Sequence, residues 1–184
     1  MIQLPVDFYL DKYGLQVRFV NESDADFIVR LRTDKELSQF LHPISPDVDI
    51  QRMWIREYKL REKEGQDYYF VFSLSGEILG LERIYDIRND SFTHGSLVFD
   101  RSAPLGTSIL ADIITREIAF EILDLSKNYF DVRKGNINVR NYHQRYNPVF
   151  LQEDSESYYY LLEKANFECN KNKYLKLFCN VGNK

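Results

Sequence analysis

Hydrophobic positions along the chain recur at two spacings, every second residue in some segments and every third or fourth in others. Leu15, Val17 and Phe19 alternate with other residues, which predicts a β-strand over residues 15–20. In residues 108–125 the apolar residues recur at three- and four-residue steps, which predicts the clearest helix in the chain. The same spacings predict further strands over residues 68–74, 78–87, 92–100, 129–133, 149–152 and 158–162, and further helices over residues 25–32, 50–64 and 138–146.

The order of these segments predicts the fold class. Three strands follow one another with short turns at Ser75-Gly76-Glu77 and at residues 88–91, which is typical of an antiparallel meander. A strand, a helix and a further strand then follow. A meander joined to such a crossover predicts a mixed α/β (α+β) domain.

The length of 184 residues fits one compact domain over residues 1–184, and no linker or repeat interrupts it. Hydrophobic residues make up 44% and charged residues 28%, a globular composition. Residues 166–184 are rich in Asn and Lys, and the pattern assigns them to no element.

Charge and cysteine content exclude several classes of function. A net charge of −4 argues against a general nucleic-acid binder, which needs an extended basic surface. The N-terminal residues contain acids and Pro5 and no long apolar run, so neither a signal peptide nor a membrane span is expected there. Cys169 and Cys179 form no metal-binding motif, so we expect no metal site and two free thiols in a reducing cytoplasm.

The segment from residue 92 to residue 125 carries the main candidate site. It runs from a strand through a short loop into the strongest predicted helix, with Gly106 in the loop and Thr107 or Ser108 as the expected N-cap. A helix N-terminus exposes unpaired N–H groups and the positive end of the helix dipole, a favourable place for a phosphate. A plain tight turn is the competing interpretation.

The loop resembles the pyrophosphate loop of the GNAT (general N-acetyltransferase) family, whose pattern is Arg/Gln-x-x-Gly-x-Gly/Ala. The sequence here is Arg101-Ser102-Ala103-Pro104-Leu105-Gly106, in which Pro104 replaces the first glycine and removes one N–H donor. The resemblance implies a twisted, mostly antiparallel sheet of six to seven strands flanked by about four helices. It also implies acetyl-CoA as co-substrate, bound by Arg101 and by the N–H groups of Leu105, Gly106, Thr107 and Ser108.

The resemblance extends to both sides of this loop. In the family, the strand before it positions the thioester, which here implies Leu97, Val98 and Phe99. An asparagine that opens a later helix contacts the pantetheine arm, which here implies Asn138. Val149 stands where the family usually has glycine.

Acetyl transfer to an amine needs a base or water path for the amine proton and assistance for the departing thiolate. Glu82 is the first candidate base, because the family often places a carboxylate of this strand toward the acceptor, and His94 is the second. Tyr146 and Tyr142 are the candidate acids, and His143 on the same helix is an alternative. For each of these residues, ordinary packing or surface pairing is the competing interpretation.

A local basic cluster runs from the end of the predicted strand 129–133 into the predicted helix 138–146. It can meet the 3′-phosphate of the cofactor or the diphosphate of a nucleotide-sugar acceptor, or it can be a solvated face. Its members are Arg133, Lys134, Arg140 and Arg145.

The sequence therefore predicts a cytoplasmic N-acetyltransferase that transfers acetyl from acetyl-CoA to a small amine. Within the family, the chain resembles the branch of ribosomal-protein and amino-sugar N-acetyltransferases. The expected acceptor is an amino sugar or a nucleotide-linked amino sugar. Acetylation of a protein N-terminus and a non-catalytic CoA-binding module are the alternatives. No nucleic acid or membrane is an expected partner, and a homodimer stays open.

Overall fold

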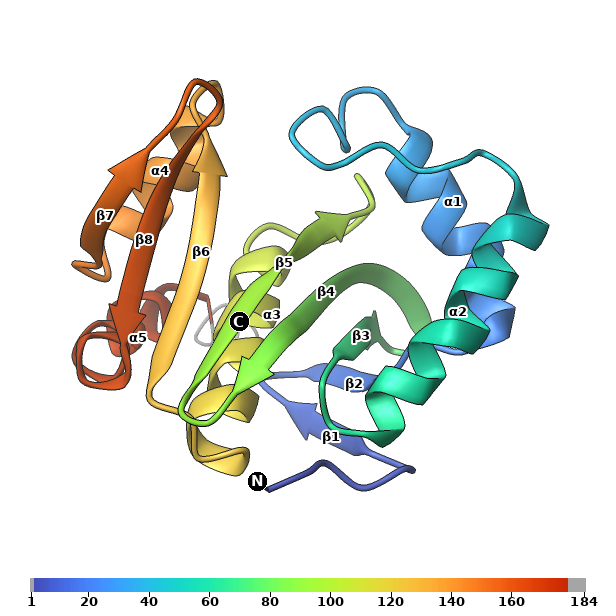
Figure 1. The fold of residues 1–184 in the computed structure, drawn as a ribbon, viewed down its shortest axis with the longest axis horizontal. Coiled ribbons are helices and arrows are strands. Elements are labelled where there is room, and N and C mark those ends of the chain that lie inside the picture. The colour runs from blue at the N-terminus through green and yellow to red at the C-terminus, as the bar shows by residue number, and fades with distance from the viewer. Residues whose placement is uncertain (1, 179–184) are drawn as a thin grey trace.

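In the computed structural model, residues 2–178 are described, and they form one sheet with helices on both of its faces (Figure 1). The eight strands run in the order β1-β2-β3-β4-β5-β6-β8-β7. The strands are β1 (Tyr9–Lys12), β2 (Leu15–Phe19), β3 (Tyr68–Leu74), β4 (Glu77–Arg88), β5 (Ser91–Phe99), β6 (Lys127–Arg133), β7 (Val149–Glu153) and β8 (Ser157–Glu163). The helices are α1 (Ala25–Thr33), α2 (Val48–Lys63), α3 (Thr107–Glu117), α4 (Ile137–Gln144) and α5 (Lys164–Phe178), with short helical segments at Glu22–Asp24 and Ile118–Ile122.

Alternation along the strands builds a separate core on each face of the sheet. In β3, Phe70 and Phe72 pack into the core under α3, whereas Tyr69 and Val71 pack into the core under α1 and α2. Successive side chains of a strand point to opposite faces, so a run of buried aromatic residues fills both cores at once. The meander predicted from the sequence thus lies at the centre of the molecule and contributes side chains to the cores on both faces of the sheet.

The sheet divides between β5 and β6, which pair in parallel, whereas the other pairs of described strands are antiparallel. These strands pair only over Ser91–Thr93 and Lys127–Tyr129 and then diverge, so that one half of the sheet carries β1–β5 and the other β6–β8 (Figure 1). Beyond Thr93, the edge of β5 therefore has no strand partner on this side within residues 2–178.

Helix α3 begins at Thr107, and its N-cap is Gly106 rather than the predicted Thr107 or Ser108. Gly106 has φ 90°, a left-handed conformation that glycine adopts without steric cost. The chain reverses sharply here from β5 into the helix, and this reversal decides which residue is the cap. The predicted helix 108–125 also changes to a π-helical segment at Ile118–Ile122.

The α+β class and the mostly antiparallel sheet are confirmed. The structure has more elements than predicted, because β1 and α5 carry weak sequence patterns. Strand β1 is an exposed edge strand, and the polar helix α5 buries only Phe167 and Tyr174.

None of the helices in the described part of the chain is long and apolar enough to cross a membrane. Cys169 is an exposed free thiol, and Cys179 lies outside the described residues.

Candidate functional site

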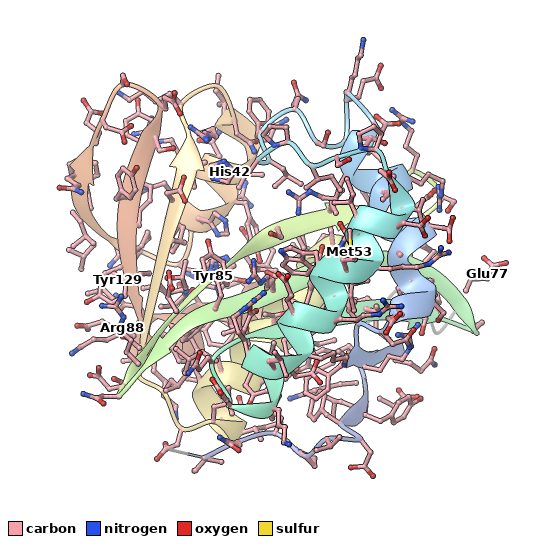
Figure 2. All side chains as sticks on the ribbon, turned by 45° about the vertical axis from the view of Figure 1, so that its right-hand side comes forward. His42, Met53, Glu77, Tyr85, Arg88 and Tyr129 are labelled. Atoms are coloured by element: carbon pink, nitrogen blue, oxygen red, sulfur yellow. The ribbon has the colours of Figure 1, made fainter. Side chains whose placement is uncertain are left out.

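Two adjoining cavities open where the sheet divides. The larger, of about 480 Å³, lies between α1, α2 and strands β3–β5, and we call it the large cavity. The smaller, of about 170 Å³, lies between the diverging parts of β5 and β6 and is closed on one side by α4; we call it the strand gap. Arg32, His42, Tyr85 and Ser96 line both, so the two cavities meet at these residues. Figure 2 shows His42 and Tyr85 in the space between the two halves of the sheet.

The wall of the large cavity carries buried polar atoms whose hydrogen bonding is incomplete. Tyr69 is 2% exposed, and neither its Oη nor the buried Nε of Arg32 makes a hydrogen bond of normal geometry among residues 2–178, although the Arg32 guanidinium is close enough to act on the hydroxyl. An unpaired buried polar group costs free energy, which a bound polar ligand would recover.

Arg83 adds a second cation to the large cavity. Its Nε donates to Asp67 at 2.7 Å, and its guanidinium lies over the rings of Trp54 and Tyr85 at 5.2 and 5.0 Å from their centroids. Among the described residues that line this cavity there is no carboxylate. Asp67 compensates the charge of Arg83, so the positive charge that favours a negatively charged ligand comes from Arg32, whose Nη2 donates to the His42 carbonyl.

The strand gap is shaped by an irregularity in β5. Leu81 pairs with Val98 and Arg83 pairs with Gly95, so β5 has an extra residue between these pairs, and Ser96 has φ 58°. This bulge turns the backbone of β5 at the gap, next to Leu97 of the predicted thioester segment. Val98 is buried in the core, and the ring of Phe99 packs on Phe72 with centroids 5.9 Å apart.

A fully buried arginine organises the residues behind the strand gap. Arg116 of α3 donates from Nη1 to Asp112 at 2.8 Å and from Nε to the Asn128 side chain at 3.1 Å. Its Nη2 lies 3.1 Å from Nε2 of His94 and 3.0 Å from Nδ1 of His143. Burial opposes the charged form of Asp112, but the charge of Arg116 and the bond from His94 outweigh it and hold the pKa of Asp112 below its ordinary value.

This arrangement assigns the protons of His94. The Asn128 amide is oriented by two contacts, because its oxygen accepts from Arg116 and its nitrogen donates to the Tyr129 carbonyl. The same nitrogen lies 3.0 Å from Nδ1 of His94, which must therefore accept. The proton is then on Nε2, 3.4 Å from the Asp112 carboxylate, so Nε2 cannot accept from Nη2 of Arg116, which is left to donate to His143. His94 is thus neutral, and burial and then the charge of Arg116 lower its pKa.

The same cluster resembles a metal site in composition. His94, Asp112 and His143 offer ligand atoms that lie within 4.8 Å of one another. The guanidinium of Arg116 touches all three side chains and supplies the positive charge at their centre. A metal ion placed there would meet a fully buried, permanently charged arginine.

Glu82, the first candidate base, lies on the α3 face of the sheet and lines neither cavity. Its neighbours in β4, Arg83 and Leu81, point to the α1–α2 face, so the alternation of the strand turns Glu82 away from the large cavity. Its carboxyl group is fully buried, and no cation is bonded to it among the described residues. Burial, and then the charge of Asp112, raise the pKa of Glu82 well above its ordinary value.

The candidate acids Tyr142 and Tyr146 also lie away from both cavities. Tyr142 donates to Asp112 at 2.5 Å, and its Oη lies 3.1 Å from that of Tyr146. Burial, and then the charge of Asp112, raise the pKa of both tyrosines. Both rings pack against Tyr174 of α5, with centroids 5.0 and 5.5 Å apart.

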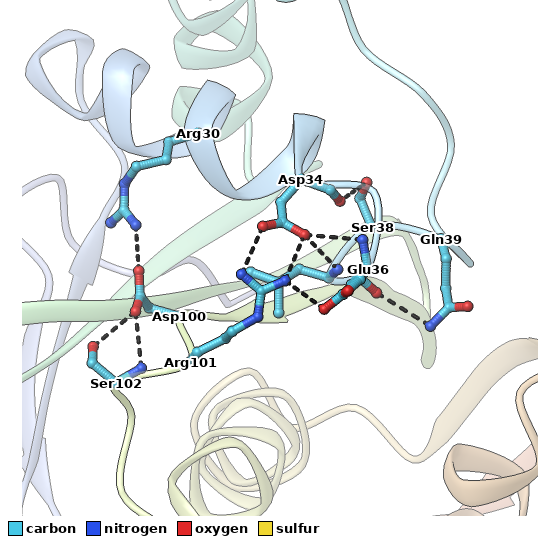
Figure 3. Close-up of polar contacts among 9 residues, drawn as sticks. Arg30, Asp34, Glu36, Ser38, Gln39, Asp100, Arg101 and Ser102 are labelled. Atoms are coloured by element: carbon cyan, nitrogen blue, oxygen red, sulfur yellow. Dashed lines mark hydrogen bonds and ion pairs between the residues drawn. The ribbon is translucent and has the colours of Figure 1, made fainter.

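The predicted phosphate loop is held to the rest of the chain by ion pairs (Figure 3). Arg101 donates to Asp34 at 2.9 and 3.0 Å and to Glu36 at 2.8 Å, while Asp100 accepts from Arg30 and from Ser102. The guanidinium of Arg101 thus binds the segment after α1. The N–H groups of Leu105, Gly106 and Ser108 have no acceptor among the described residues, whereas that of Thr107 donates to the Pro104 carbonyl.

Helix α5 closes this loop on one side. A Cβ atom placed on Gly106 would lie 2.2 Å from the ring of Phe178. The described end of α5 therefore packs directly against the N-terminus of α3.

Asn138 does not open α4. It is exposed in the first turn, and Asn136 is the N-cap, with its side chain accepting from the N–H of Val139 at 3.4 Å. Asn136, not Asn138, lines the strand gap. An asparagine caps a helix from the position just before the first helical residue. Asn136 and Asn138 both lie near the start of α4, so the sequence alone did not show which of them is the N-cap.

The basic cluster also separates. Arg133 and Lys134 pair with Glu156 and Glu153, whereas Arg140 lies over the Tyr158 ring at 4.0 Å.

Four residues of this region were not predicted from the sequence: Arg32, Asp112, Arg116 and Asn128. The one available signal was the spacing of Asp112 and Arg116, which places an acid and a base one turn apart within the most apolar helix.

No family model matches the sequence, and no curated protein matches it. Among solved structures, the apo structure of FdhC, a nucleotide-linked sugar GNAT, is 31% identical with a TM-score of 0.83, covering 94% of this chain and 99% of that one. Mycobacterium smegmatis RimJ in complex with CoA-disulfide matches at 15% identity and a TM-score of 0.74, covering 92% and 91%. The spermidine N-acetyltransferase from Vibrio cholerae, in complex with CoA and spermine, matches at 15% identity and a TM-score of 0.72, covering 85% and 99%. The last two share the fold.

Proposed function

Because the chain belongs to the GNAT family, we propose that it is an N-acetyltransferase that moves acetyl from acetyl-CoA to the amine of a nucleotide-linked amino sugar. The observation that carries the choice of acceptor is the large cavity, with its arginines, its unpaired tyrosine hydroxyl and no lining carboxylate among the described residues.

Acetyl-CoA would be held by the backbone more than by charged side chains. The free N–H groups of Leu105, Gly106 and Ser108 at the start of α3 suit its pyrophosphate. From there the pantetheine arm would run into the strand gap, where the edge of β5 beyond Thr93 can pair with its amides. This assignment gives Arg101 a role in holding the loop.

The acceptor would fill the large cavity and present its amine where the two cavities meet, near Tyr85 and Ser96. Arg32 and Tyr69 are placed to bind its polar groups, and the rings of Trp54 and Tyr85 offer apolar faces to a sugar or base. A polyamine would meet two arginines there and no carboxylate among the described residues. FdhC, with which this chain shares 31% identity, is described as a nucleotide-linked sugar GNAT.

In the reaction, the amine nitrogen forms a bond to the thioester carbon, and the bond from that carbon to sulfur breaks. The amine proton passes to water or to Asp131, the carboxylate that lines the strand gap, and the thiolate takes a proton from water. The products are an amide and free CoA. Glu82 contacts no substrate in this scheme.

The test follows thiol release from acetyl-CoA with a panel of amines: a nucleoside-diphosphate-linked amino sugar, the free amino sugar, spermidine and a peptide with a free N-terminus. We expect kcat/KM for the nucleotide-linked sugar to exceed that for the others by about tenfold or more, since one charged contact is worth that much. Preference for spermidine or the peptide would overturn the acceptor assignment. A CoA-induced rise in Tm without release for any amine would favour a binding module, and no rise in Tm would contradict CoA binding itself.

Tyr69→Phe tests the cavity directly. Removing an unpaired buried hydroxyl should leave Tm unchanged or raise it, while the KM for the acceptor rises about 3- to 10-fold, the value of one hydrogen bond. Tyr159→Phe is the matched control, because its hydroxyl bonds Asp154 outside both cavities and should not affect KM. An unchanged acceptor KM in Tyr69→Phe would remove Tyr69 from the acceptor site.

A further inference from the structure

The side chain of His143 belongs to the buried cluster and also lines the strand gap. His143 lies near the end of α4, is 5% exposed, and lines the gap together with Val139 and Asn136. Its Nδ1 lies 3.0 Å from Nη2 of Arg116, and its Nε2 has no hydrogen-bond partner among the described residues. Since Nδ1 is engaged by Arg116 and the ring lines the strand gap, Nε2 is the nitrogen available to a ligand there.

Arg116 decides which nitrogen of His143 carries the proton. A guanidinium only donates hydrogen bonds, so Nδ1 must accept, and a neutral imidazole then bears its proton on Nε2. Protonation of Nδ1 would set two positive groups against each other in a buried site. Burial and then the charge of Arg116 hold the pKa of His143 well below its ordinary value. The other titratable groups packed around it are Asp112, His94 and Tyr142. His143 therefore presents an N–H donor to the strand gap and no lone pair.

We propose that His143 is a catalytic residue that donates a hydrogen bond from Nε2 to the sulfur of the departing thiolate, and that Arg116 is the positioning residue that fixes this tautomer. The inference rests on the proposed function, because it needs a thioester in the strand gap. The unpaired edge of β5 on the opposite wall is available to the carbonyl oxygen, which leaves the donor on α4 for the sulfur.

The donor stabilises charge and does not give up its proton. A neutral imidazole N–H is too weak an acid to protonate a thiolate, whose conjugate thiol has a pKa of about 8.5 in unperturbed form. As the carbon–sulfur bond breaks, the electron pair moves to sulfur, the Nε2–H bond shortens toward it, and water later supplies the proton. A preorganised donor aimed at developing charge is typically worth about 10²-fold in kcat.

Two substitutions separate a donor from a base. Glutamine can donate from its amide and accept from Arg116 with its oxygen, but it cannot act as a base, whereas phenylalanine can do neither. We expect His143→Phe to lower kcat about 10²-fold with the KM for acetyl-CoA little changed, and His143→Gln to recover about tenfold or more of that loss. Equal loss in both variants would overturn the proposal, and so would full turnover in His143→Phe.

A measurement on the unaltered protein covers the case in which these variants fail to fold. Nitrogen-15 NMR of histidine-labelled protein distinguishes the two neutral tautomers and the imidazolium. We expect His143 to be in the Nε2–H form near neutral pH, and Arg116→Lys to give a mixture of forms. The Nδ1–H form or the imidazolium in the wild type would overturn the proposal. The tautomer can be measured even if no amine stimulates thiol release. Failure of the proposed function can therefore be distinguished from failure of the proposal for His143.

Discussion

At the scale of single residues, the protonation of each buried group follows from its neighbours more than from its type. Glu82 and Asp112 are both fully enclosed carboxyl groups, yet their pKa values shift in opposite directions. Asp112 is bonded to the cation Arg116 and to Tyr142, whereas Glu82 has no cation bonded to it among the described residues and lies near the charge of Asp112. Asp112 is therefore the ionised carboxylate of the pair and Glu82 the neutral one.

This contrast predicts the behaviour of Glu82→Gln. Because the folded state raises the pKa of Glu82, it binds more protons than the unfolded state, so the wild type loses stability as pH rises from the unfolded pKa toward the folded one. Glutamine has no such loss. We expect Glu82→Gln to be at least as stable as the wild type near neutral pH, with an advantage that grows with pH in urea unfolding between about pH 5 and about pH 8.

Turnover in the same variant tests the role of Glu82 in catalysis. With Glu82 on the α3 face, Glu82→Gln should keep kcat within about threefold of the wild type. A loss of about 10²-fold or more would restore Glu82 as the base and contradict its exclusion from the site.

At the scale of elements, the junction between β5 and α3 depends on one glycine and one ring. Gly106 combines a left-handed backbone with a position directly beneath Phe178 of α5. The left-handed backbone makes a side chain at position 106 unfavourable through strain. The ring of Phe178 makes it unfavourable through a steric clash. The two effects can be measured separately.

Gly106→Ala should lower the free energy of unfolding by about 1–3 kcal/mol through backbone strain, with a further loss from the clash with Phe178. In a Phe178→Ala background only the strain should remain, so the cost of Gly106→Ala should shrink. Gly106→Asn is the control for strain, since asparagine tolerates the left-handed region better than alanine. Equal costs in both backgrounds, measured by thermal or urea unfolding, would show that Phe178 does not rest on Gly106.

At the scale of the whole molecule, contacts between segments distant in the sequence enclose the site. The large cavity needs the segment after α1, which contributes His42, Ile44 and Ser45 to its wall. Arg101 at the β5–α3 loop bonds to Asp34 and Glu36 at the start of that segment (Figure 3). The loop proposed to bind the cofactor is thereby joined to the wall of the large cavity, which is proposed to bind the acceptor.

If the main role of Arg101 is its ion pair with Asp34, both Arg101→Ala and Asp34→Ala should raise the KM for the acceptor, by a similar several-fold factor. The double variant should be little worse than either single one, because both remove the same contact. The CoA dissociation constant should change little. Arg56→Ala, which breaks a similarly exposed ion pair with Glu22, is the control. Weaker CoA binding in Arg101→Ala, but not in Asp34→Ala, would instead make Arg101 a phosphate ligand.

Much of the element order could be predicted from the sequence because hydrophobic spacing is a local property. The strand over residues 68–74 and the helix after Gly106 can each be predicted from their own apolar residues. Their tertiary neighbours are not needed for that prediction. Strand β1 and helix α5 escaped prediction because each buries too few side chains to leave a clear pattern. The GNAT assignment likewise rested on local order and on Arg101–Gly106.

The sequence by itself determined the α+β class, the order of most elements and the loop before α3, since these follow from the period of the apolar residues and from Gly106. Only the tertiary structure decided the site. The register of β4 turned Glu82 away from the large cavity, and the divergence of β5 and β6 made the strand gap. Arg116 reaches His94, Asn128 and His143 across 22, 12 and 27 residues of sequence, and only folding brings them within hydrogen-bond distance. Protonation depends on these distances, so the chemistry of the site was set by packing.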